Sequence, residues 1–63
     1  MRRHRNRIPP VRTWRVRYYD QHNVLMSEVF VGTINKRFAK WLARERNWLQ
    51  AYYAHRTTVS LVD

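Results

Sequence analysis

The chain has 63 residues, a formal net charge of +9 and no cysteine. This length allows one small domain, and the lack of cysteine excludes a disulfide framework and a thiolate metal site. No run of about 18 apolar residues occurs, and no apolar stretch of signal-peptide type follows the basic N-terminus, so the sequence predicts a cytoplasmic protein without a membrane span. The protein is expected to be a monomer or a homodimer. The core of so small a domain is marginal, and a homodimer would add buried apolar surface at its interface.

Arginine carries most of the positive charge. The sequence contains eleven arginines, two lysines and only four acidic residues. Arginine suits bidentate binding of phosphate, and a strongly basic domain favours a polyanionic partner. The alternative is a basic protein that is soluble but has no such partner.

Residues 1–10, MRRHRNRIPP, are expected to form a flexible basic arm. The segment has no acidic residue and few apolar ones, so self-repulsion disfavours folding. Pro9 and Pro10 stiffen its exit into a single domain over residues 11–63. The arm is either a solubilising tail or a segment that lies on phosphates or in a minor groove. Its candidate nucleic-acid contacts are Arg2, Arg3, Arg5 and Arg7.

Residues 12–19 alternate in the manner of a half-buried strand. Trp14, Val16 and Tyr18 fall on one face. Arg15 and Arg17 fall on the other face, where they are candidate contacts together with Arg12 at the start of the strand. Residues 20–23 then predict a hairpin loop, because Asp and Asn tolerate turn geometry.

A second strand is predicted over residues 24–31, with apolar residues on both faces. Such a pattern indicates a central strand or one whose second face is covered. Gly32, the single glycine, is expected to form the corner between strand and helix, and Thr33 to cap the helix.

One long amphipathic helix is predicted from Thr33 to Tyr53. At 100° per residue, one arc collects large apolar side chains that we expect to face the core. These are Ile34, Phe38, Trp41, Leu42, Leu49 and Tyr52. A basic row of Lys36, Lys40 and Arg44 runs along the flank, with Arg37 beside it, and all four are candidate nucleic-acid contacts.

A third strand is predicted over residues 57–62, with Val59 and Leu61 pointing inward. The expected fold class is therefore α+β, a small antiparallel sheet in β-β-α-β order packed against one long helix. The predicted core between sheet and helix consists of Trp14, Val16, Phe38, Leu42 and Leu49.

No pattern in the sequence indicates catalysis. His4, His22 and His55 have none of the spacings of a metal site, and no glycine-rich phosphate loop occurs. We therefore expect a protein that is not an enzyme and uses no metal or cofactor.

Several residues, in order, give a resemblance to a known module. They are Arg2, Arg3 and Arg5, then Pro9 and Pro10, then Trp14, Val16 and Tyr18, and then Phe30, Thr33, Ala39 and Trp41. Over residues 2–46 the chain resembles the amino-terminal arm-binding domain of phage and transposon tyrosine recombinases. In that family the sheet enters the DNA major groove, so the resemblance implies such a role for Arg15 and Arg17.

The leading hypothesis is a small protein that binds duplex DNA and belongs to a phage or another mobile element, in the host cytoplasm if phage-encoded. An RNA-binding accessory protein is a second hypothesis, since arginine and exposed aromatic residues also suit single-stranded RNA. A third is a small inhibitor or adaptor that binds a host protein. A fourth is a membrane-surface peptide, because the predicted helix is basic, amphipathic and rich in tryptophan.

Overall fold

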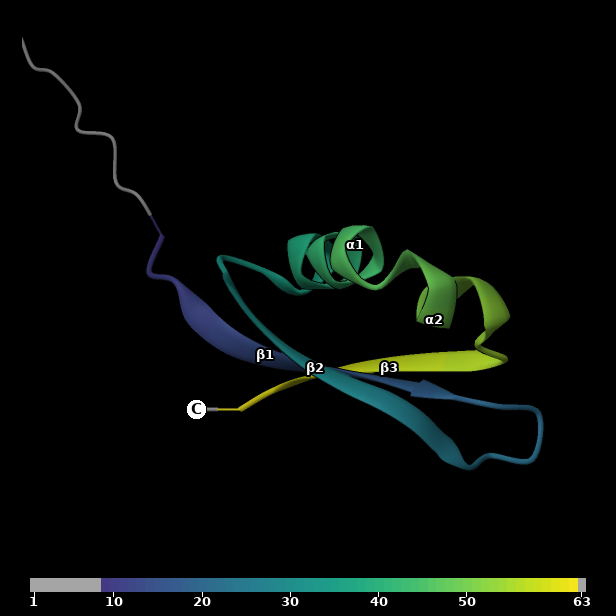
Figure 1. Cartoon of the computed structure of the whole chain (residues 1–63). Helices are drawn as coiled ribbons and strands as arrows, with labels where there is room; N and C mark the ends of the chain where they lie inside the picture. Colours follow the sequence, from purple (N-terminus) through teal and green to yellow (C-terminus); the bar gives the residue numbers. More distant parts are fainter. Residues whose placement is uncertain (1–8, 63) are drawn as a thin grey trace, which may run out of the picture.

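The computed structural model describes residues 9–62, which form a three-stranded antiparallel sheet and two helices (Figure 1). The elements in chain order are β1 (Arg12–Tyr19), β2 (Leu25–Thr33), α1 (Lys36–Arg46), α2 (Trp48–Tyr53) and β3 (Arg56–Leu61). The α+β class is confirmed, but the order is β-β-α-α-β, so the prediction of one long helix is wrong. The arm predicted over residues 1–10 lies outside the described residues except for Pro9 and Pro10. No helix in the described range is long and apolar enough to cross a membrane.

The first strand is the centre of the sheet. The strand order is β2-β1-β3, and β1 pairs antiparallel with both neighbours. Val16 lies opposite Val29 on one side and Val59 on the other. The predicted bounds of β1 are confirmed, whereas β2 is shifted toward the helix and ends at Thr33.

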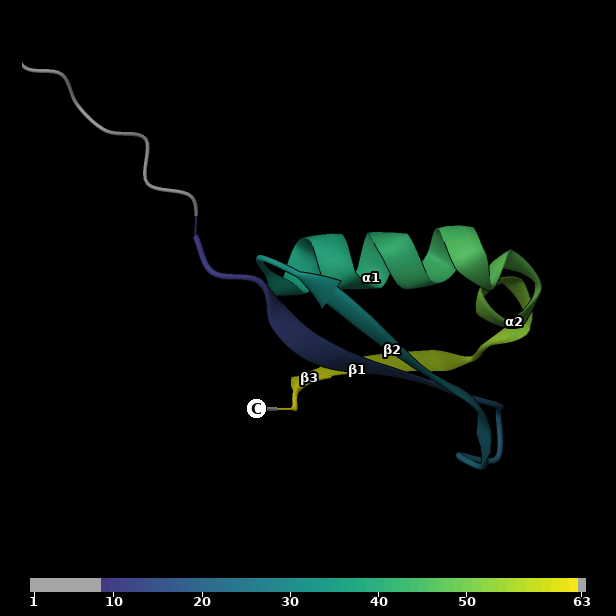
Figure 2. The same cartoon turned by 60° about the vertical axis from the view of Figure 1, so that its left-hand side comes forward.

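Alternation along β1 separates a covered face from an open face. Val16 and Tyr18 are fully buried beneath the helices, whereas Arg15 and Arg17 lie on the opposite face. Both helices cover the same side of the sheet, and the other side has no helix over it (Figure 2). The strand pattern therefore predicted correctly which residues of β1 share each face.

The loop between β1 and β2 depends on Asp20. The backbone N–H groups of His22 and Val24 donate to Asp20 Oδ1 over 2.8 and 3.0 Å. Asn23 has a positive φ of 67°, which asparagine tolerates well. The hydrogen bond from Val24, and next that from His22, lower the pKa of Asp20 below its ordinary value, because they favour the carboxylate. The predicted loop at residues 20–23 is confirmed.

We expect Asp20 to make folding sensitive to acid. Its pKa is lower in the folded chain than in the unfolded one, so its contribution to stability is present above the ordinary carboxyl pKa near 3.8 and is lost as pH falls through the folded value. Asp20→Asn keeps an acceptor oxygen but cannot titrate. Thermal unfolding followed from pH 6 to pH 2 should show a smaller loss of Tm in Asp20→Asn than in wild type, and equal losses would contradict this role.

The corner between β2 and α1 differs from the prediction. Gly32 lies inside β2 without a positive φ, and Thr33 is the buried last residue of that strand. The strand continues to this point because Thr33 pairs with Arg12 of β1, and the Trp14 Nε1–H also donates to the Thr33 carbonyl over 3.1 Å. Asn35 is the N-cap, since its extended backbone lets Oδ1 accept from the Phe38 N–H over 2.9 Å. Thr33 is therefore not the cap, and Gly32 is not the corner.

Asn47 divides the predicted helix. Its φ of −131° and ψ of 47° are not helical, and its side-chain amide donates to the Ala43 carbonyl over 3.2 Å. Its backbone N–H donates to the same carbonyl over 2.8 Å. Asparagine competes in this way for backbone groups that a helix would use. As a result α1 ends at Arg46 and α2 begins at Trp48.

Two alanines, not the large side chains, bring α1 onto the sheet. Ala39 and Ala43 are fully buried beside Val16, Tyr18 and Val31. They lie one turn apart, and their small size lets the helix backbone approach the strands while the sheet supplies the larger side chains.

The predicted core is therefore partly wrong. Val16 is buried, and Trp14 and Leu42 pack partly buried against the core. Phe38 and Leu49 are 46% and 49% exposed. In β3, Val59 packs against the core, while Leu61 is exposed.

Substitutions on opposite sides of α1 should test this orientation. Ala43→Leu adds volume to a fully buried position, so it should destabilise the domain by roughly 1–3 kcal/mol. Trp41→Ala removes a larger but 56% exposed side chain, so it should change stability by less. Urea unfolding of both variants measures the difference, and a greater loss for Trp41→Ala would show that the helix faces the sheet with its aromatic side.

Candidate nucleic-acid interface

The open face of the sheet collects charged, aromatic and hydroxyl side chains from all three strands. The strand register places Thr13, Arg15, Arg17 and Tyr19 on it from β1, Glu28 and Phe30 from β2, and Arg56, Thr58 and Ser60 from β3. We call this set the open face. Arg15 and Arg17, both predicted contacts, lie at its centre because β1 is the central strand.

Glu28 lies within ion-pair distance of both central arginines. The Arg17 Nε–H donates to Glu28 Oε2 over 2.6 Å, while Arg15 Nε lies 3.9 Å from the same oxygen. The Glu28 carboxylate, and next the Tyr19 hydroxyl, raise the pKa of Arg17 above its ordinary value, so it is cationic at every physiological pH. Arg15 Nε is buried without a hydrogen-bond partner, although 34% of the Arg15 side-chain surface is exposed.

Arg56 is a third arginine of the open face, and it is not among the contacts predicted from the sequence. Its guanidinium carbon lies 4.3 Å from the centre of the Tyr19 ring. Its Nε–H and an Nη2–H donate to Asn23 Oδ1 over 3.1 and 2.8 Å. Its partner Asn23 lies 33 positions earlier in the chain, so no local pattern in the sequence indicates the contact.

The open face is therefore positive and ordered. Its three arginines are balanced by one acid, Glu28, and each arginine is oriented by Glu28 or by Tyr19 and Asn23. Exposed ion pairs of this kind add little stability. These ion pairs do restrict the arginine side chains before a ligand arrives. Less rotamer entropy is then lost when an arginine binds a phosphate or a base.

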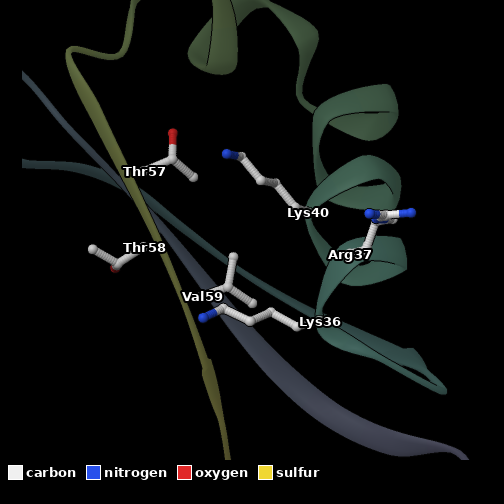
Figure 3. Close-up of a pocket in the computed structure, with 6 residues that line it drawn as sticks. All are labelled: Lys36, Arg37, Lys40, Thr57, Thr58 and Val59. Atoms are coloured by element: carbon white, nitrogen blue, oxygen red, sulfur yellow. The ribbon is translucent and has the colours of Figure 1, made fainter.

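A second basic surface lies beside β3, and we call its four residues of α1 the helix row: Lys36, Arg37, Lys40 and Arg44. Lys36, Arg37 and Lys40 line a cavity of about 660 Å³ together with Thr57, Thr58 and Val59. Lys36 and Lys40 extend from α1 toward β3, whose Thr57 and Val59 side chains point back toward the helix (Figure 3). Arg44 lines a neighbouring hollow of about 220 Å³ with Lys40, Thr57, Tyr18 and Ala51. Within residues 9–62, none of these four cations forms an ion pair with an acid.

The remaining predicted contacts lie elsewhere. Arg12 is half-buried at the start of β1, opposite Thr33, on the face that the helices cover. It does not join Arg15 and Arg17. Arg2, Arg3, Arg5 and Arg7 lie outside the described residues.

The other flank of the helices is apolar and exposed. Ile34, Phe38 and Trp41 belong to the arc that was predicted to face the core, but α1 is rotated so that Ala39 and Ala43 face the sheet instead. We call the three exposed residues the apolar flank. Trp48, Leu49 and Tyr52 of α2 are exposed as well.

Comparison with known proteins gives no relative: no family model matches, and neither the curated proteins nor the solved structures contain a match. In the described part of the chain, no three His, Asp or Glu side chains come together in a group that could hold a metal. The function is therefore inferred from the surfaces themselves.

Proposed function

We propose that the protein is a small, non-enzymatic nucleic-acid-binding protein that binds duplex DNA through the open face of its sheet. The observation that carries this proposal is the set of three oriented arginines, Arg15, Arg17 and Arg56, around one carboxylate on a face that neither helix covers. Arginine forks of this kind can bind phosphates and can also pair with guanine in a major groove. The recombinase resemblance supports the same use of Arg15 and Arg17, and with it a phage or mobile-element origin.

The helix row has a supporting role in this proposal. Lys36 and Lys40 are compact charges on flexible stems, which suit contacts to the phosphate backbone rather than to bases. They lie on the helix side of β3, while Arg56 and Ser60 lie on the open side of the same strand. The two basic surfaces therefore meet at the β3 edge, where one strand of nucleic acid can contact both.

Charge reversal should separate the two surfaces. Arg15→Glu with Arg17→Glu should abolish sequence-specific binding, since it places three acids together at the centre of the open face. Lys36→Glu with Lys40→Glu should weaken binding to all sequences and lower the slope of log K against log salt by about 0.9 for each lost phosphate contact. Fluorescence anisotropy with labelled duplexes at several salt concentrations measures both effects.

Glu28 supplies a matched control in the opposite direction. Glu28→Gln removes the only acid of the open face but keeps an acceptor for Arg17, so it should tighten duplex binding. If the helix pair proves more damaging than the sheet pair, the open face is not the primary contact. If neither pair changes affinity, the nucleic-acid proposal is wrong.

Phe30 favours an RNA-binding function as the second candidate. It is 53% exposed on the open face and lies opposite Arg15. An aromatic ring beside a guanidinium is suited to stacking an unpaired base. Phe30→Ala should reduce binding of single-stranded RNA while leaving duplex DNA binding nearly unchanged, and competition between the two nucleic acids shows which is preferred.

The apolar flank favours the third candidate, a small adaptor or inhibitor that binds a host protein. Phe38 and Trp41 are aromatic, about half exposed and on one side of α1, which suits contact with an apolar groove. A partner that remains bound after nuclease treatment, and that Trp41→Glu releases while Lys40→Glu does not, would favour this function. Loss with both variants would instead indicate a charged contact.

A further inference from the structure

Tyr18, a residue that lines the hollow between α1, α2 and β3, has a buried hydroxyl without a partner in the described structure. Tyr18 is 1% exposed, and its hydroxyl oxygen makes no hydrogen bond within the described structure. A buried polar group without a partner is unfavourable, and such groups are rare in native structures. Tyr18 lines this hollow of about 220 Å³ together with Lys40, Arg44, Ala51 and Thr57.

The groups around the hollow share one chemistry. Lys40 and Arg44 are cations without an acidic partner in the described chain, and Thr57 adds a hydroxyl. Burial raises the pKa of Tyr18, although the nearby charge of Arg44 acts in the opposite direction. The phenol is therefore neutral and can donate a hydrogen bond. Two cations and two hydroxyl donors with no carboxylate among them suit an anion that has several acceptor oxygens.

We propose that this hollow binds one phosphate group, with Lys40 and Arg44 supplying charge and the hydroxyls of Tyr18 and Thr57 donating hydrogen bonds. The volume exceeds the roughly 30 Å³ that one water molecule occupies in the liquid, so it admits a group of several heavy atoms. Lys40 and Arg44 are exposed, so their cationic ends are accessible to a ligand from solvent. The assignment of this phosphate to a nucleic-acid backbone rests on the proposed function, whereas the site itself would also take a free phosphate.

The first measurement is the Tm of the full chain in inorganic phosphate against chloride at matched ionic strength. Phosphate should raise the Tm of wild type, because a ligand that binds the folded state stabilises it. Tyr18→Phe should lower phosphate affinity about tenfold, the usual size for a hydrogen bond to a charged group. Thr57→Val and Lys40→Gln should also lower it. Tyr53→Phe, at an exposed tyrosine of α2, is the matched control and should behave as wild type.

Tyr18→Phe gives a second readout that needs no ligand. Because the hydroxyl has no partner in the free protein, its removal should leave the Tm in chloride unchanged or higher. A clearly lower Tm would show that the hydroxyl is bonded in the free protein and would overturn the proposal. An equal phosphate-induced rise in Tm for wild type, Tyr18→Phe and Thr57→Val would also overturn it.

A labelled duplex then distinguishes the two sources of phosphate. Weaker duplex binding by Tyr18→Phe, by a factor close to that for inorganic phosphate, would support a backbone phosphate in the hollow. Unchanged duplex binding together with weaker phosphate binding would support the site for a free phosphate. In that case the DNA-binding proposal still stands on the arginines of the open face, so the two proposals can fail separately.

Discussion

The contact of Ala39 and Ala43 with the central strand determines how the rest of the domain is arranged. These alanines pack against Val16 and Tyr18 of β1, so α1 lies close to the sheet in one rotational setting. On a helix, the residue after Ala39 is turned by about 100° to one side of this stripe, and the residue before it is turned by as much to the other side. Lys36 and Lys40 therefore reach β3, and Phe38 and Trp41 are left exposed on the other side. The separation of basic and apolar surfaces follows from this one contact.

The sequence predicted the strands better than the orientation of the helix. Alternation over residues 12–19 depends on a period of two, and the large Trp14, Val16 and Tyr18 leave no doubt about the covered face. For α1, the sequence pattern favoured the face with the large aromatic side chains. That face includes Phe38, whose direction on the helix differs by about 100° from that of the buried Ala39. Alanine adds little to an apolar pattern, yet it permits the closest packing. Whether alanine or an aromatic residue faces the sheet depends on the size of the strand side chains that it meets. The sequence of the helix alone gives no information about those side chains.

In the candidate site, residues that follow a pattern within one segment were predicted, whereas residues that depend on contacts between distant segments were not. Arg15 and Arg17 were found because they alternate with core residues on one strand, and the helix row was found from its spacing of four. Arg56 could not be found in this way, because it is oriented by Tyr19 at the end of β1 and by Asn23 in the loop between β1 and β2, both far from it in the sequence. Glu28 likewise pairs with Arg17 only because the register of β1 and β2 places them opposite each other. The register is a property of the folded sheet.

The place of β3 in the sheet has a consequence for the kinetics of folding. This strand follows both helices in the chain, yet it pairs with the first strand, so Val16 meets Val59 only after 43 positions have been brought together. Loop closure over such distances slows folding, and the β1–β2 hairpin can form earlier because its strands are neighbours. We therefore expect Arg56, Thr57 and the β3 side of the 660 Å³ cavity to be assembled after the hairpin. An intermediate that contains only the hairpin would present Arg15 and Arg17 but would lack Arg56 and Thr57, so the open face and the helix row meet only in the native state.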